Sequence, residues 1–101
     1  SKSYPEVQRI VRHEHERWDG NGYPDGIAGN DIPLGSRLIM IADTYDAICS
    51  ERPYRKALPS EAALEIIQKG AGTQFDPNLV SIFESTYKEF PCATTTSSLP
   101  Q

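Results

Sequence analysis

Cysteines and long apolar runs, which mark secreted and membrane proteins, are both scarce in this sequence. Only Cys49 and Cys92 occur among its 101 residues, too few for a disulfide framework or for a zinc site of cysteine pairs, and we expect both to be plain thiols. The longest apolar run, 38–42, is far shorter than the roughly 20 residues of a membrane span, and the first residues lack the apolar stretch of a signal peptide. The sequence therefore predicts a cytoplasmic protein, or the cytoplasmic part of a longer chain, with no membrane insertion.

Positive charge is also in short supply. Ten Lys and Arg residues against 14 Asp and Glu residues give a formal net charge of -4 at pH 7. Proteins that bind duplex nucleic acid usually carry a net basic face, because contacts to phosphate supply much of their affinity. We therefore expect no duplex nucleic acid among the partners of this chain.

The alternation of apolar and polar residues that predicts a β-strand is missing as well. The sequence instead predicts an all-α helical bundle, with helices over 5–18, from 33 or 34 to 50, over 61–69 and from Asp76 and Pro77 onward. The central helix carries apolar residues all round, so we expect it to be buried on most sides. One domain over 1–91 and a small, polar, disordered tail over 92–101 complete the prediction.

A long loop separates the first two predicted helices. Five glycines and two prolines occur between Asp19 and Ser36, a density that no helix or strand interior would tolerate. Loops longer than about 12 to 15 residues are uncommon and often functional. Apolar residues within this one predict that it is ordered, and we interpret it as functional.

Two histidines and a carboxylate stand just before this loop. At about 100° per residue, Glu14 falls in the middle of the apolar stripe of the first predicted helix, His15 at its edge and His13 well away from it. A carboxylate aimed at a core needs a partner, because an isolated buried charge is costly. A buried ion pair, a frayed helix end and ligation of a metal all remain open at this point.

The central helix carries a similar anomaly, since Asp43 and Asp46 lie among apolar residues. Either carboxylate could pair with Arg37 or Arg52. If one converged with His15 instead, the oxygen and nitrogen donors would suit iron, manganese or zinc.

The segment 52–56, RPYRK, places three cations around a rigid turn. Forked guanidinium groups in such a turn can bind phosphate. Basic residues also complement the negative end of a helix, and for an isolated motif of this kind we favour that second interpretation.

Taken together, these segments resemble the C-terminal part of an HD-GYP domain. The motifs that carry the resemblance are HEHERWDGNGYP at 13–24, IADTYDA at 41–47 and SERPYR at 50–55, within a similarity that covers about 7–87. The resemblance implies part of an HD-domain-like fold with a long GYP loop. It also implies a bacterial signalling phosphodiesterase that hydrolyses cyclic di-GMP at a binuclear or trinuclear metal site, usually of iron or manganese.

The resemblance assigns metal ligands by position. His15 matches the second histidine of the adjacent pair in the family, and Asp43 matches the metal-binding aspartate of the following helix. Glu14 stands where the first histidine is expected, so the resemblance implies a carboxylate ligand or an altered site there. The stripe argument favours Glu14 over His13 as the inward residue.

Substrate contacts follow in the same way. Gly22, Tyr23 and Pro24 supply the GYP element, which in the family shapes the substrate pocket and is implicated in contact with GGDEF domains. Arg52 and Arg55 match the basic turn, which would bind a substrate phosphate or hold the loop in place.

The His-Asp pair that gives the family its name, and a further histidine ligand, are expected N-terminal to this segment and are not in the sequence. We therefore expect half of a metal site and an inactive chain when it is alone, with hydrolysis in the complete domain. The alternatives are a non-catalytic interaction module that uses the GYP loop, and a phosphohydrolase for another cyclic dinucleotide or nucleotide.

Overall fold

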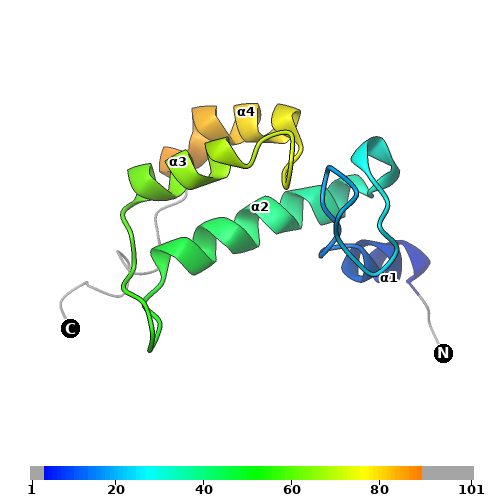
Figure 1. Cartoon of the computed structure of the whole chain (residues 1–101), viewed down its shortest axis with the longest axis horizontal. Coiled ribbons are helices and arrows are strands. Elements are labelled where there is room, and N and C mark those ends of the chain that lie inside the picture. The colour runs from blue at the N-terminus through cyan, green and yellow to red at the C-terminus, as the bar shows by residue number, and fades with distance from the viewer. Residues whose placement is uncertain (1–3, 90–101) are drawn as a thin grey trace.

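Glycine- and proline-rich connections divide the chain into helices, as the sequence predicts. The computed structural model describes residues 4–89 (Figure 1). Within them lie four α-helices and two 3-10 helices: α1 (Pro5–Arg12), η1 (Gly29–Asp31), α2 (Leu34–Cys49), α3 (Ser60–Lys69), α4 (Pro77–Thr86) and η2 (Tyr87–Glu89). Residues 4–89 contain isolated β-bridges but no strand, which confirms the all-α class. No helix in this range is long and apolar enough to cross a membrane. The predicted tail, 92–101, lies outside the described residues.

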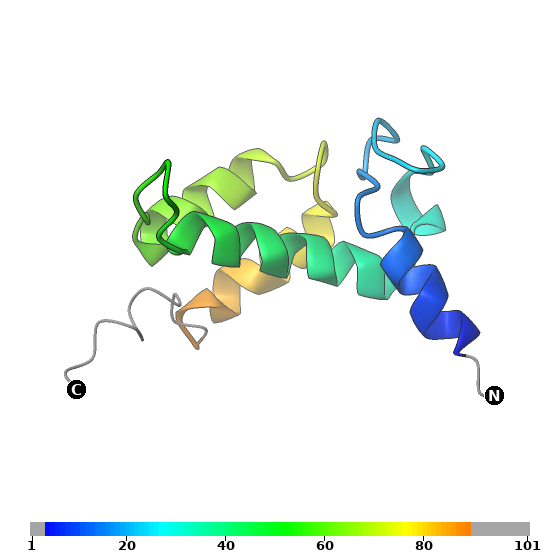
Figure 2. The same cartoon turned by 90° about the horizontal axis from the view of Figure 1, so that it is seen from below.

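Helix α2 is the centre of the arrangement and contacts α1, α3 and α4. Figures 1 and 2 show α3 and α4 covering one side of α2, while α1 lies at the N-terminal end of α2. Buried apolar residues fill the space between α2 and the other two helices: Met40, Ile41, Tyr45, Cys49, Ala63, Ile67, Phe75 and Val80. The fold therefore has one core, on one side of α2.

The other side of α2 faces solvent, so the prediction of a helix buried on most sides is wrong. Leu38 is 49% exposed, and Ala42, Asp43 and Asp46 are exposed as well. Apolar residues all round a helix predict cover all round. Among the described residues, however, only α3 and α4 bury residues of α2 in an apolar core, and they cover one face.

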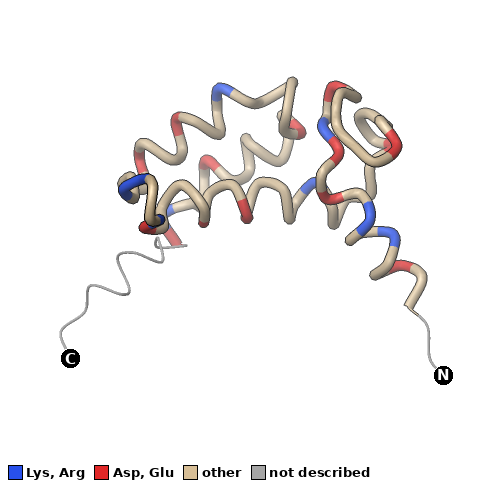
Figure 3. The backbone as a smooth tube through the Cα atoms, turned by 60° about the horizontal axis from the view of Figure 1, so that its bottom comes forward, with Lys and Arg blue, Asp and Glu red and all other residues tan. Residues whose placement is uncertain are grey.

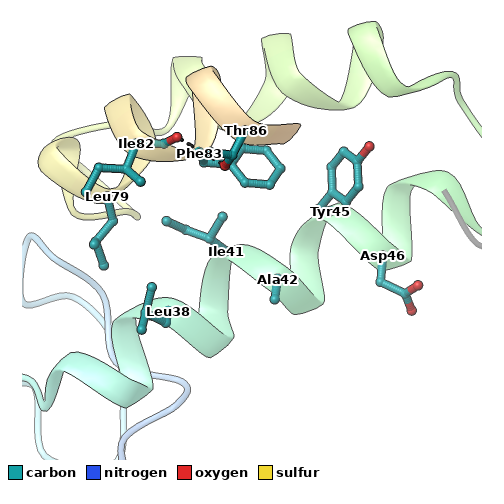
Figure 4. Close-up of a pocket in the computed structure, with 9 residues that line it drawn as sticks. All are labelled: Leu38, Ile41, Ala42, Tyr45, Asp46, Leu79, Ile82, Phe83 and Thr86. Carbon is teal, nitrogen blue, oxygen red and sulfur yellow. Dashed lines mark hydrogen bonds between the residues drawn. The ribbon is translucent and has the colours of Figure 1, made fainter. Parts of the chain in front are cut away.

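An apolar groove runs between α2 and α4, at the edge of the core (Figure 4). Its volume is about 470 Å³, and its walls are Leu38, Ile41, Ala42, Tyr45, Asp46, Leu79, Ile82, Phe83 and Thr86. The rings of Tyr45 and Phe83 meet edge to face at 5.0 Å between centroids. Residues 4–89 leave the groove open, with Ile82 60% exposed.

Helix α1 ends at Arg12 and not at Trp18, which corrects the predicted boundary. The backbone N–H of His13 donates to Ile10 O at 3.3 Å, and that of Glu14 donates to Val11 O at 3.4 Å, so the last turn tightens to three-residue spacing. Residues 13–15 then continue as turns. The side chains after Arg12 therefore do not follow the helical periodicity on which the stripe argument depends.

Asp76 caps the start of α4, where the sequence predicts that a helix begins, and it also connects α4 to α2. Its Oδ1 accepts a hydrogen bond from the backbone N–H of Asn78 at 2.8 Å, and its Oδ2 lies 2.6 Å from Nη1 of Arg37. Nε of Arg37 also donates to Ile32 O at 2.9 Å. Arg37 is thus paired with Asp76, and it forms no ion pair with Asp43 or Asp46 within the described residues.

The long loop is ordered by the turn that precedes α4. We call residues 19–33 the GYP loop, after the sequence Gly22-Tyr23-Pro24. The backbone N–H of Asp19 donates to Thr73 O at 2.9 Å, and that of Trp18 donates to Gln74 O at 3.1 Å. Ile32 at the end of the loop is fully buried. These contacts confirm that the loop is shaped and anchored.

Cys49 is buried in the core at the end of α2, and the structure records it as disulfide-bonded. No free cysteine occurs in the described part of the chain. The expectation of a plain thiol is therefore wrong for Cys49. The other cysteine of the sequence, Cys92, lies outside the described residues.

Candidate functional site

A pocket of about 360 Å³ opens where the end of α1, the GYP loop and α2 meet. The residues that line it come from four segments: Glu14, His15, Glu16 and Arg17 before the loop, Tyr23 within it, Met40, Asp43, Thr44 and Ala47 on α2, and Gln74 from the turn before α4. Tertiary packing thus gathers Glu14, His15 and Asp43, the three predicted metal ligands, around one cavity.

The three predicted ligands differ in exposure. Glu14 is half-buried, whereas His15 and Asp43 are exposed. Their ligand atoms do not all lie within 4.8 Å of one another, so they line the pocket without closing around one point. An imidazole and two carboxylates are a donor set that suits iron or manganese.

His13 is the buried member of the cluster before the loop, which corrects the stripe argument. The residue is 8% exposed, and Nδ1 lies 3.1 Å from Oε2 of Glu16. The stripe argument assumes a helix through Trp18 and places His13 away from the interior. Because α1 ends at Arg12, the turn after it directs His13 inward.

Glu16, which the sequence did not single out, is the most buried charged residue of the site, with 0% exposure. Its Oε2 accepts a hydrogen bond from the backbone N–H of Asp25 at 2.8 Å, and its Oε1 accepts one from Gly26 at 2.9 Å. Burial alone would raise the pKa of Glu16, but the hydrogen bonds from Asp25, His13 and Gly26 together lower it. The sequence signal was a carboxylate shortly before a glycine-rich loop, whose backbone N–H groups need acceptors.

His13, Glu16 and Asp25 form the one group of three ligand-type side chains in residues 4–89 whose atoms lie within 4.8 Å of one another. The carboxylate oxygens of Glu16 and Asp25 already accept hydrogen bonds from the protein. Nε and Nη2 of Arg12 donate to the two carboxylate oxygens of Asp25 at 3.1 and 2.8 Å, and the hydrogen bond from Arg12 lowers the pKa of Asp25. We therefore interpret this group as a hydrogen-bonded closure of the loop.

Tyr23 and His15 are adjacent at the pocket. Their rings are stacked, with 5.2 Å between centroids and an interplanar angle of 9°, and the backbone N–H of Tyr23 donates to His15 O at 3.2 Å. Tyr23 is nevertheless 63% exposed. A Cβ added at Gly22 would lie 2.5 Å from the backbone N of Arg17 and 2.6 Å from His15 O, so only glycine permits this approach.

The basic turn lies at the other end of α2, away from the GYP loop (Figures 1 and 3). Nη2 of Arg55 donates to Ala47 O at 2.7 Å, close to the C-terminus of α2. Arg52 and Arg55 are joined by backbone hydrogen bonds, and neither lines the pocket. The geometry of Arg55 favours the complement of a helix end over a phosphate site.

Comparison with protein families matches residues 2–79 to the HD domain. A cyclic di-GMP phosphodiesterase response regulator of Xanthomonas campestris is 49% identical over 71 residues, which cover 70% of this chain and 19% of that protein. A probable cyclic di-GMP phosphodiesterase of Vibrio cholerae is 45% identical over 77 residues, which cover 76% of this chain and 18% of that protein.

A crystal structure of a cyclic GMP-AMP-specific phosphodiesterase of V. cholerae is similar to the fold. Its TM-score is 0.75 at 29% sequence identity, and the match covers 88% of this chain and 20% of that one. The chain thus spans about a fifth of the length of the relatives it matches. The matched range contains α1, the GYP loop, α2 and α3 together with the three candidate ligands, and it shows that the chain belongs to the HD domain family.

Proposed function

We propose that this chain is the part of a metal-dependent cyclic dinucleotide phosphodiesterase that carries the GYP loop, with Glu14, His15 and Asp43 as metal ligands. The observation that carries the proposal is the shared pocket, which gathers these side chains from two separate parts of the fold. The names of the relatives support cyclic di-GMP as substrate. Iron or manganese as the metal, a cytoplasmic location and GGDEF-domain partners belong to the same proposal.

The residues of the chain would divide the work between metal and substrate. His15, just before the loop, and Asp43, on α2, are both exposed and line the pocket, and Glu14 adds a second carboxylate next to His15 in the sequence. A bound metal ion supplies positive charge that polarises a scissile phosphate. Gly22, Tyr23 and Pro24 would shape the space for substrate next to this wall.

The basic turn has a separate place in the proposal. Arg52 and Arg55 either contact a substrate phosphate or hold the end of α2 in place. The hydrogen bond from Arg55 to Ala47 O supports the second role.

Metal binding tests the proposal at its ligands. We expect the chain to bind Mn²⁺ in calorimetry, and we expect Glu14→Gln, His15→Gln and Asp43→Asn each to weaken binding by at least about tenfold. Asp46→Asn is the matched control, because Asp46 is exposed on α2 but does not line this pocket. Equal binding by all variants, or a loss confined to the control, would contradict the assignment.

Two alternatives concern what the site acts on. The V. cholerae structure is of a cyclic GMP-AMP-specific enzyme, which supports another cyclic dinucleotide as a second candidate substrate. The 63% exposure of Tyr23 supports an interaction module that uses the GYP loop. Reading the gene upstream of this segment separates catalysis from the module: a His-Asp pair at the expected distance favours hydrolysis, and its absence from the gene favours the module. The chain by itself should hydrolyse cyclic di-GMP negligibly.

A further inference from the structure

We infer that Glu16 is a positioning residue of this site: its buried carboxylate closes the GYP loop and thereby holds Tyr23 against His15 at the pocket. The inference rests on the proposed function for the role of His15 as a ligand. The geometry of the loop, which does not involve a metal, carries the rest.

Glu16 collects three donors that belong to two segments. Oε2 accepts from the backbone N–H of Asp25 at 2.8 Å and lies 3.1 Å from Nδ1 of His13, while Oε1 accepts from the backbone N–H of Gly26 at 2.9 Å. The side chain is fully buried. A carboxylate is the side chain of this size that can accept at both oxygens, whereas a glutamine turns an amino group toward at least one of these donors.

The segment that Glu16 holds is the one that carries Tyr23. Residues 22–26 turn back on residues 13–17, because Tyr23 N–H donates to His15 O and Gly22 approaches the backbone of Arg17. Two anchors therefore flank Tyr23 and Pro24: the hydrogen bond to His15 on one side and the hydrogen bonds to Glu16 on the other. Loosening the second anchor releases the stacked pair at the wall of the pocket.

The ion pair of Arg12 and Asp25 braces this closure from outside. Arg12 donates to both carboxylate oxygens of Asp25, but the pair is exposed, so its contribution is weaker than that of the buried carboxylate. The side chain of Glu16 itself reaches the loop backbone and His13, and it does not need a metal to satisfy its oxygens.

The test compares Glu16→Gln with Glu14→Gln in the 101-residue chain, first without metal. For Glu16→Gln we expect amide hydrogen exchange at Asp25 and Gly26 to quicken by about tenfold. The NMR shifts that the Tyr23 ring imposes on His15 ring protons should be lost, while amides in the core of α3 and α4 keep their shifts. Glu14→Gln should leave all of these signals unchanged.

The second measurement is Mn²⁺ affinity of the same variants. Glu16→Gln should weaken Mn²⁺ binding by about tenfold through the misplaced His15, and Glu14→Gln should weaken it without any change in the metal-free loop. Unchanged exchange and unchanged His15 shifts in Glu16→Gln would overturn the inference, as would a loosened loop with wild-type Mn²⁺ affinity.

If the wild-type chain binds no Mn²⁺, the proposed function fails, and the positioning of Tyr23 against His15 is then decided by the metal-free signals alone. If Glu16→Gln does not fold, Arg12→Gln replaces it. Removal of the outer brace should change exchange at Asp25 and the His15 shifts in the same direction by a smaller amount, and no change in either would refute the closure.

Discussion

Asp19, at the start of the GYP loop, is held by an ion pair and by a hydrogen bond from the backbone. Its carboxylate oxygens accept hydrogen bonds from Nε and Nη2 of Arg17 at 3.2 and 3.1 Å, and from the backbone N–H of Asn21 at 3.0 Å. The hydrogen bonds from Arg17 and Asn21 lower the pKa of Asp19 from 3.8 to about 2. The ionised side chain of Asp19 thus holds together the turn with which the GYP loop begins.

Because the pKa of Asp19 is lowered in the folded chain, the free energy of unfolding depends on pH in the acid range. A carboxyl whose pKa is lower in the folded chain stabilises it above the ordinary pKa, and this contribution is lost as the pH falls toward about 2. We expect the free energy of unfolding to fall between about pH 4 and about pH 2, and to fall less in Asp19→Asn and in Arg17→Gln. Urea unfolding at several pH values measures this. Variants that lose as much stability as the wild type over this range would disprove the assignment.

At the scale of elements, α2 and α4 are joined at their N-terminal ends by Asp76. The same carboxylate caps α4 and pairs with Arg37 of α2, and Arg37 in turn binds the carbonyl of Ile32 at the end of the GYP loop. Its guanidinium also lies 6.0 Å from the ring centroid of Trp18. One buried ion pair thus sets the positions of two helices and the loop relative to one another.

Removal of Asp76 should destabilise the fold through both of its roles. We expect Asp76→Ala to lower the free energy of unfolding by about 3 kcal/mol, because it removes the cap of α4 and leaves the guanidinium of Arg37 without its ion-pair partner. Asp76→Asn should recover part of this loss, since an amide oxygen can still cap α4. Chemical unfolding followed by circular dichroism gives the values. Asn78→Ala is the control, because Asn78 contributes its backbone N–H to the cap, and a similar loss there would refute the argument.

At the scale of the whole molecule, the fold has one covered face and one open face. The core lies between α2 and the pair α3 and α4, and the apolar groove of Figure 4 lies open beside it. Open apolar surface larger than a few hundred Å² is unusual for a monomer. The open face of α2 also carries Asp43, so the candidate site and the apolar surface share one helix.

This open face should make the isolated chain associate. We expect light scattering to detect dimers or larger species, and a hydrophobic dye to bind. Leu38→Glu and Ile82→Glu, which place charges on the exposed wall of the groove, should shift the chain toward a monomer and reduce dye binding. A monodisperse wild-type monomer with sharp cooperative unfolding would speak against an uncovered face.

Much of the architecture follows from local patterns that are visible in the sequence. The start of α4 at Pro77, the end of α3 before Gly70 and the extent of α2 agree with the predictions, because caps, prolines and terminating glycines act over a few residues. The HD-GYP motifs identified the family for a similar reason: they are contiguous. The assignment of Glu14, His15 and Asp43 as ligands stays a prediction that the shared pocket supports.

Tertiary structure decided what depends on partners distant in the sequence. The end of α1 at Arg12 and the inward direction of His13 are tied to Glu16, whose donors at Asp25 and Gly26 come from the far side of the loop. The exposure of Asp43 depends on which faces of α2 the other helices cover. Periodicity assigns a face to a residue within a regular helix, but it cannot say where that helix yields to a hydrogen-bonded loop or what packs against it.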